Sequence, residues 1–265
     1  MTGEDRRLGA FDTDAAALGR RIAAHDRYGT RDLDPWVMER LELTGGMRVL
    51  ELGCGTGKQT LPIAEAVGKT GRVLAIDASA EGLASLREEA GKRGLQERIG
   101  LTNVAFDDLD ASMLAGPFDR VVSCYALYYT REPSLLLGMV AAAMAPASML
   151  FFCGPSAANN AELKQFCAQL DGASERRPEP DRAIEFMEVT GVELARGLFG
   201  EVEELEFENP LRFDSAEALV SYWTSYNLYD PELEEAFELA AQRHFEGNRV
   251  FETVKRMRAV RARKG

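Results

Sequence analysis

The sequence predicts an α/β fold in which a doubly wound, mostly parallel seven-stranded sheet carries helical cap insertions. Short apolar runs alternate with helix-length amphipathic segments between residues 47 and 153, which is typical of parallel strands joined by crossover helices. A glycine-rich turn follows the first of these runs. In a doubly wound sheet, the carboxyl end of the first strand is where ligands bind.

The core elements are predicted from apolar periodicity and from the residues that end each run. The first 45 residues are expected to be helical, in segments 15–25 and 35–43, with Asp34 as the N-cap of the second. Five apolar runs predict strands: residues 47–52, 72–76, 104–106 (weakly), 118–124 and 148–153. Helices are predicted between them at residues 60–67, 80–93 and 133–144.

The second part of the chain is predicted to complete the sheet and cover one end of it. Two further strands are expected at residues 202–207 and 250–260. Residues 154–200 and 214–248 have mostly helical patterns, and the first of these contains a polar break at 175–181. The basic tail of the last strand is expected to lie on a solvated sheet edge, where charges discourage pairing with another chain.

Composition excludes several classes of function. The chain has 265 residues with 43 acidic and 31 basic side chains, a formal net charge of −12, and such a surface repels the phosphates of nucleic acids. Its apolar stretches are too short for a membrane span, and residues 1–7 do not lead into a signal-peptide core. Four cysteines without CxxC spacing and two histidines predict neither a metal site nor disulfides, so a cytoplasmic location is expected.

The sharpest local feature is the glycine turn Glu51-Leu52-Gly53-Cys54-Gly55-Thr56-Gly57. Alternating glycines permit backbone angles and close approaches that a Cβ atom would forbid. Their spacing differs from the dinucleotide fingerprint G-x-G-x-x-G, because position 58 is lysine, and this argues against a nicotinamide dehydrogenase. Glu51 would repel a pyrophosphate but would suit a ligand that carries an ammonium or sulfonium charge.

A second acid, Asp77, ends the second predicted strand, 20 residues after Gly57. An acid at this position can accept hydrogen bonds from both ribose hydroxyls, as in dinucleotide-binding folds. The two acids together predict a nucleoside with an amino-acid appendage, and S-adenosylmethionine fits that description.

The run from about residue 28 to 153 resembles the class I S-adenosylmethionine-dependent methyltransferases, and within them the small-molecule enzymes of the ubiquinone and menaquinone biosynthesis type. The resemblance rests on VLELGCGTG, VLAIDAS, AFDDLD and FDRVVSCYALYYTREP, in that order. It implies a Rossmann-like methyltransferase fold with S-adenosyl-L-methionine as cofactor. It also implies one domain over 1–265, composed of an N-terminal lid (1–45), a cofactor-binding core (46–153), two substrate-cap insertions (154–200 and 214–248) and two last strands (201–213 and 249–265).

The resemblance also implies roles for individual residues. The methionine part of the cofactor is expected at Glu51, Gly53, Cys54, Gly55 and Gly57. Its ribose and adenine are expected at Asp77, Ala78, Ser79, Phe106, Asp107 and Asp108, and Ser123 and Cys124 are expected near the reactive methyl group. Two departures matter. Many relatives carry a His-His or His-Phe pair where this chain has Tyr128-Tyr129. In addition, no Asn-Pro-Pro-Tyr-type tetrapeptide, which marks amino methylation of bases or glutamine, follows the fourth strand.

Several residues outside the cofactor motifs have two interpretations. Tyr28 either packs on the neighbouring helix or serves as a lid residue. His25 and His244 are candidate proton acceptors beside Tyr128, or plain surface histidines. Tyr222, Trp223 and Tyr226 have helical spacing that is typical of a core, with a substrate lining as the alternative. Three more candidate substrate contacts are Tyr125, Tyr129 and Asn159, although a helix cap is the favoured interpretation of Asn159-Asn160.

The predicted reaction is in-line transfer of a methyl group to an oxygen or nitrogen of a small metabolite, without a metal. A dry pocket that aligns nucleophile, methyl and sulfur would supply most of the acceleration. A protein that binds the cofactor without methyl transfer is the alternative. Partners are expected to be a small-molecule acceptor, without nucleic acid or membrane, on a monomer or homodimer.

Overall fold

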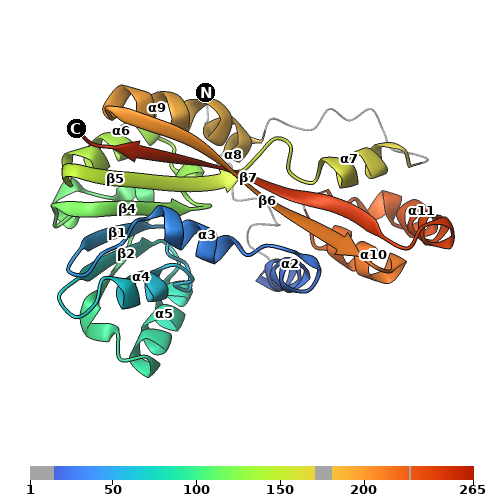
Figure 1. The fold of residues 1–265 in the computed structure, drawn as a ribbon, viewed down its shortest axis with the longest axis horizontal. Helices are drawn as coiled ribbons and strands as arrows, with labels where there is room; N and C mark the ends of the chain where they lie inside the picture. The colour runs from blue at the N-terminus through green and yellow to red at the C-terminus, as the bar shows by residue number, and fades with distance from the viewer. Residues whose placement is uncertain (1–14, 171–180, 227) are drawn as a thin grey trace, which may run out of the picture. The chain divides into compact units, whose positions relative to one another are not determined.

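A computed structural model describes residues 15–170, 181–226 and 228–265. In this part of the chain, seven strands form one sheet in the order β3-β2-β1-β4-β5-β7-β6 (Figure 1). The strands are β1 (Arg48–Leu52), β2 (Arg72–Asp77), β3 (Ile99–Asn103), β4 (Phe118–Cys124), β5 (Met144–Pro155), β6 (Glu201–Phe213) and β7 (Phe251–Arg263). The first five pair in parallel, and β7 runs antiparallel to β5. The predicted fold class is confirmed.

The chain divides into two compact units. The described residues of the first, here called the sheet unit, are 33–157, 181–207 and 257–265. Those of the second, here called the helical unit, are 15–32, 158–170, 208–226 and 228–256. The segment 154–200, expected as one insertion, contributes to both units, whereas residues 214–248 belong to the helical unit alone.

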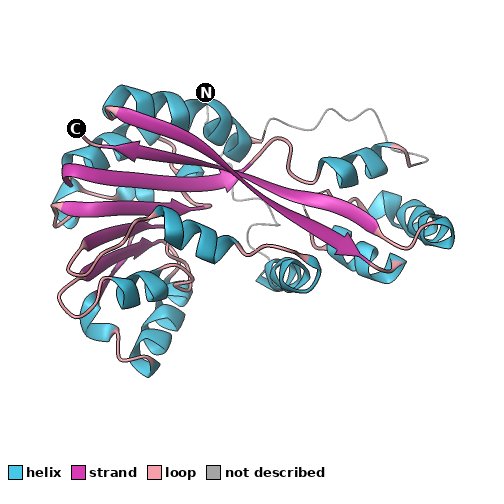
Figure 2. Ribbon diagram, viewed as in Figure 1, coloured by secondary structure: helices cyan, strands magenta, loops and turns pink. Residues whose placement is uncertain are grey.

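The sheet unit buries both faces of its sheet under helices (Figure 2). Alternate residues of β1 point to opposite faces, so Val49 belongs to one hydrophobic cluster and Leu50 to the other. The first cluster includes α3 (Leu33–Arg40), α4 (Thr60–Ala66) and α5 (Ala80–Lys92); the second includes α6 (Pro133–Ala142) and α9 (Gly191–Leu198). Burial on both faces explains why β1 is a continuous apolar run.

The third strand is not where the sequence placed it. β3 spans Ile99–Asn103, and the predicted residues 104–106 lie after it, where Phe106–Asp108 form a short 3-10 turn. β3 is the last strand at one edge of the sheet and has only partly buried or exposed residues. An edge strand with weak burial lacks a continuous apolar run, so the more apolar residues after it gave a misleading signal.

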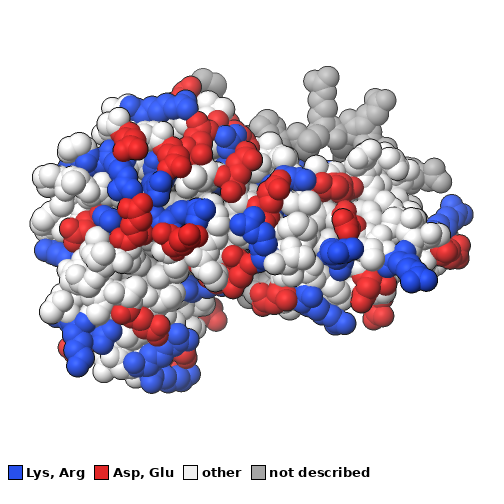
Figure 3. All heavy atoms as spheres, viewed as in Figure 1, with Lys and Arg blue, Asp and Glu red and all other residues white. Residues whose placement is uncertain are grey.

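The last strand is also placed differently from the expectation. β7 lies between β5 and β6 and is therefore not a sheet edge. Its basic side chains are matched by acids instead: Arg258 pairs with Glu204 at 2.7 Å, and Arg261 pairs with Glu203 at 2.5 Å, both glutamates on the neighbouring β6. On the visible face, acidic and basic side chains are interspersed rather than segregated (Figure 3).

The helical unit has its own aromatic core. Its described helices are α2 (Ala15–Tyr28), α7 (Ala161–Ala168), α10 (Ala216–Thr224) and α11 (Glu234–Gly247). The Trp223 ring stacks on that of Phe237, with centroids 4.0 Å apart and 4° between the planes. The adjoining ends of β6 and β7 supply Phe213 and Phe251 to the same cluster. None of the helices in the described residues is long and apolar enough to cross a membrane.

Candidate functional site

The glycine turn follows β1 at the carboxyl edge of the sheet, and each of its glycines has positive φ: +77° at Gly53, +52° at Gly55 and +90° at Gly57. A Cβ atom on Gly53 would lie 2.1 Å from Ala126 Cβ, and one on Gly57 would lie 2.2 Å from a Leu86 methyl. A Cβ on Gly55 would meet nothing within 4 Å. The outer glycines are therefore required by packing, whereas the middle one leaves open space against the backbone.

Glu51 lies beneath this turn with only 2% of its surface exposed. The Thr60 hydroxyl, at the first residue of α4, donates a 2.5 Å hydrogen bond to Glu51 Oε2. Burial raises the pKa of Glu51 to about 8; the Thr60 hydrogen bond opposes this rise and the negative charge of Asp77 adds to it. Without a cation nearby, the carboxyl group is thus held mostly protonated near neutral pH, and a bound cation would favour its charged form.

Asp77, the last residue of β2, is connected to the turn directly. The backbone N–H of Gly55 donates to Asp77 Oδ2 at 2.7 Å, and that of Ser79 donates to Oδ1 at 2.7 Å. Ser79 in turn caps α5 by accepting from Gly82 N–H. A carboxylate has about four acceptor sites, so each oxygen keeps capacity for a ligand hydroxyl.

Asp107, which follows β3, binds mainly to Thr130 and Arg131. Oδ1 accepts hydrogen bonds from the Thr130 hydroxyl and the Arg131 N–H, both at 2.8 Å, and the Arg131 guanidinium lies 3.1 Å from Oδ2. Burial raises the pKa of Asp107, but these hydrogen bonds and the Arg131 charge outweigh it, so the net pKa is lowered. Phe106 lies close to the turn, 3.6 Å from where a Gly53 Cβ would be, while Asp108 is exposed.

The end of β4 contributes a serine and three tyrosines to this edge. Ser123 is fully buried and donates a 2.8 Å hydrogen bond to the Leu52 carbonyl, which ties β4 to β1 just before the turn. Tyr125 has a positive φ of 57°, so the chain turns sharply after the strand. The rings of Tyr128 and Tyr129 lie 4.8 Å apart, and Tyr129 is 42% exposed.

The remaining candidates belong to the helical unit. His25 Nε2 lies 3.4 Å from the Tyr222 hydroxyl, and His25 Nδ1 lies 3.3 Å from Lys255 Nζ. The Tyr222 hydroxyl also accepts from Asn160 Nδ2 at 2.8 Å, and burial raises the pKa of Tyr222. Tyr222 and Trp223 are 1% and 0% exposed, so the structure places both in the core of this unit.

Tyr28, Asn159 and His244 also make contacts within the helical unit. The ring of Tyr28 packs against Phe213 with centroids 4.9 Å apart. The Asn159 amide donates a 2.5 Å hydrogen bond to the Tyr226 hydroxyl. His244 Nε2 lies 3.0 Å from the Val250 carbonyl oxygen, which can accept its N–H.

Two helix-cap expectations are wrong. Asn160 precedes α7 but makes no side-chain cap, because its Oδ1 accepts from the Thr253 hydroxyl at 3.3 Å while its Nδ2 donates to Tyr222. Asp34 lies inside the first turn of α3 rather than before it. Its carboxylate instead contacts the glycine-turn region, accepting from Gln59 Nε2 at 2.9 Å and pairing with Lys58 Nζ at 3.1 Å.

Sequence reasoning missed Thr60, Lys58 and Gln59, the residues that follow the turn. The available signal for Thr60 was a hydroxyl residue at the start of the helix, three positions after the last glycine. Its position facing Glu51 depends on how α4 packs, which the local sequence does not encode.

The carboxyl edge of β1 and β2 fits an adenosyl amino acid. Gly55 leaves a backbone cradle, Asp77 has acceptor capacity for ribose hydroxyls, and Glu51 Oε1 has no hydrogen bond within the described residues. Glu51 and Asp77 together favour a cation and disfavour a pyrophosphate. Within the described residues, no group of three or more His, Cys, Asp or Glu side chains could hold a metal ion.

Comparison with known proteins gives similarity to methyltransferases. Aklanonic acid methyltransferase DauC of a Streptomyces strain is 31% identical over 119 residues, which cover 43% of this chain and 51% of that protein. The ubiquinone biosynthesis O-methyltransferase of a Caulobacter strain is 32% identical over 105 residues, covering 40% and 39%. The matches thus span about half or less of these curated relatives.

Comparison with solved structures also gives a methyltransferase fold. A crystal structure of a SAM dependent methyltransferase from Aquifex aeolicus has a TM-score of 0.50 and 18% identity, covering 72% of this chain and 91% of that one. The model of the methyltransferase domain family matches residues 43–212, which include β1 through most of β6. The chain therefore belongs to the methyltransferase domain family.

Proposed function

We propose that this protein transfers a methyl group from S-adenosylmethionine to an oxygen or nitrogen atom of a small metabolite. The observation that carries the proposal is a pair of acids beside one glycine turn: Glu51, which is buried, and Asp77, which accepts from the Gly55 N–H, with open space where a Gly55 side chain would be. A pyrophosphate cofactor would be repelled by this pair, whereas an ammonium and sulfonium ligand would be attracted.

We assign the sheet-unit residues the roles that the resemblance to methyltransferases implies. Glu51 and the backbone of Gly53, Cys54, Gly55 and Gly57 hold the amino-acid part of the cofactor. Asp77 accepts from the ribose hydroxyls, while Ala78, Ser79, Phe106, Asp107 and Asp108 surround the adenine, and Ser123 fixes the strand ends beneath the methyl group. The cofactor supplies an activated methyl group, so these residues need only bind, orient and exclude water.

On the acceptor side, Tyr125 and Tyr129 supply aromatic contact from the sheet unit. Tyr222 and Trp223 are buried in the core of the helical unit and are left out of the acceptor site. If the acceptor is a hydroxyl, its proton goes to Tyr128, His25 or His244; an amine that arrives neutral needs no protein base.

The test uses S-adenosylmethionine with a labelled methyl group and a panel of small acceptors. The panel contains phenols, amines and carboxylic acids, with aklanonic acid and ubiquinone precursors included because of the relatives' names. Label that enters an acceptor in wild type, and is lost in Asp77→Ala, supports the proposal. Tight cofactor binding without transfer to any acceptor in the panel or in a metabolite extract would instead support a cofactor-binding protein.

A separate kinetic experiment tests which residue accepts the proton. With a hydroxyl acceptor, Tyr128→Phe, His25→Gln and His244→Gln each test one candidate base. Substitution of the residue that acts as the base should lower kcat by about 10²–10⁴-fold and change how kcat depends on pH. An unchanged kcat in all three variants would remove these residues from the catalytic machinery.

A further inference from the structure

Two neighbouring parallel strands begin with aligned arginines, and a third arginine immediately precedes the next strand. Arg48 of β1 stands directly opposite Arg72 of β2 in the sheet register. The β2–β3 register pairs Val73 with Ile99, so Arg98, the last residue of a short 3-10 helix before β3, lies next to the start of β2. Residues opposite one another on adjacent strands project from the same face. Arg48 and Arg72 therefore project from the same face, and Arg98 lines the same groove at the amino edge of the sheet, at the opposite end of β1 from the glycine turn.

These guanidinium groups are held by neutral acceptors. Within the described residues none of the three forms an ion pair, in contrast to Arg258 and Arg261 of β7. Their partners are backbone carbonyl oxygens, of Ala115 for Arg48, of Lys69 and Gly71 for Arg72, and of Ala64 for Arg98. Like charges opposite one another on adjacent strands destabilise a sheet unless they are compensated, and a bound anion would compensate them.

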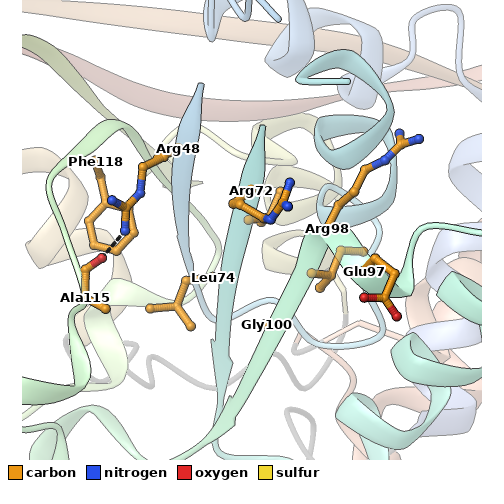
Figure 4. Close-up of a pocket in the computed structure, with 10 residues that line it drawn as sticks. Arg48, Arg72, Leu74, Glu97, Arg98, Gly100, Ala115 and Phe118 are labelled. Atoms are coloured by element: carbon orange, nitrogen blue, oxygen red, sulfur yellow. Dashed lines mark hydrogen bonds between the residues drawn. The ribbon is translucent and has the colours of Figure 1, made fainter. Parts of the chain in front are cut away.

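The arginines border a groove of about 330 Å³ (Figure 4). Its floor is apolar: it includes Leu74, two residues after Arg72 on β2, and the ring of Phe118, whose centroid lies 5.9 Å from the Arg48 guanidinium carbon. Gly100 keeps the floor open, since a Cβ there would have Leu74 Cδ1, 3.6 Å away, as its nearest neighbour. Glu97, on the outer side, is the one acid among the lining residues.

We propose that this amino-edge groove binds a small organic polyanion, with two or more carboxylate or phosphate groups on a compact body. Guanidinium groups bind carboxylates and phosphates through paired N–H bonds, and each of these arginines retains N–H donors beyond those on the carbonyl groups. The groove volume is at the small end of ligand sites. An apolar floor beneath a cationic rim selects anions that carry a hydrocarbon part over simple ions.

Calorimetry on the full chain tests the proposal at fixed ionic strength. Citrate serves as the carboxylate probe and fructose 1,6-bisphosphate as the phosphate probe, and the tighter of the two identifies the source of the anion. We expect saturable binding of at least one probe, weakened about 10- to 100-fold in Arg72→Gln, because a charge-assisted pair is lost. Gly100→Leu, which fills the floor but keeps all three arginines, should weaken binding as well.

The control is Arg87→Gln, an exposed arginine on α5 that makes the same change in net charge outside the groove. It should change affinity by no more than about twofold, since distant exposed charges are screened. Circular dichroism checks the fold of each variant, and S-adenosylhomocysteine affinity should be unchanged in Arg72→Gln, which separates this site from the cofactor site. No saturable binding of either probe, equal weakening by Arg87→Gln, or unchanged affinity in folded Arg72→Gln or Gly100→Leu would overturn the proposal.

Discussion

The Thr60 hydroxyl donates a 2.5 Å hydrogen bond to the buried carboxyl group of Glu51, and so joins the first residue of α4 to the strand before the glycine turn. Both residues are almost fully buried. The hydrogen bond lowers the pKa of Glu51 against the opposing effect of burial. Thr60 therefore helps to set how readily Glu51 becomes the anion that a cationic ligand requires.

Thr60→Val should weaken S-adenosylhomocysteine binding by about tenfold, because the carboxylate loses its donor and is harder to ionise. Calorimetry at neutral pH measures the change. The matched control is Thr253→Val, which removes another buried threonine hydroxyl that donates to a glutamate, Glu162, but in the helical unit. Equal affinities for wild type and Thr60→Val would contradict a role for this hydrogen bond.

Glu51 should make folding stability depend on pH in a defined window. Its pKa is raised in the folded protein from 4.5 to about 8, so the folded state binds more protons than the unfolded state between these values. The stabilising contribution is complete below pH 4.5 and is lost as the pH rises through about 8. Glu51→Gln should therefore become more stable relative to wild type from pH 5 to pH 8, by a few kcal/mol. Denaturant unfolding at several pH values measures this, and a constant difference would disprove the assigned shift.

Asp77→Ala should weaken S-adenosylhomocysteine by one to two orders of magnitude, since a charge-assisted acceptor for ribose hydroxyls is lost. Asp110→Ala is the matched control: Asp110 accepts from the N–H two residues ahead, as Asp77 does, but at an exposed turn away from the glycines. Calorimetry should show a near-normal affinity for the control. If Asp77→Ala also bound normally, the ribose assignment would fail.

Substitutions at Gly57 and Gly55 should affect different properties: the first the stability of the fold, the second the affinity for the cofactor. Gly57→Ala places a methyl group 2.2 Å from Leu86, so thermal unfolding should show a large loss of stability. Gly55→Ala meets no protein atom within 4 Å and costs only about 1 kcal/mol of backbone strain. Its methyl group would fill the proposed cradle, so cofactor affinity should decrease more than stability. A Gly55→Ala protein with normal cofactor affinity would place the ligand elsewhere.

The sequence alone determined the fold class, the glycine turn and the two acids that flank it. These features depend on local rules: apolar strands buried on both faces, glycines where φ is positive, and strand ends that meet at one edge of a parallel sheet. The residues 118–124 were placed at the observed bounds of β4 because that strand is central and almost wholly buried. β3 was misplaced because an edge strand lacks that continuous apolar signal.

Tertiary structure decided the rest, because contacts between distant segments leave no local pattern. It placed β7 inside the sheet beside the glutamates of β6, where its arginines are neutralised by cross-strand pairs. It brought Thr60 to Glu51 through the packing of α4, and it bound the Asn160 side chain to Thr253 and Tyr222 in place of a helix cap. It also aligned Arg48 with Arg72, since the register between two strands 24 residues apart is set by the sheet and not by either strand alone.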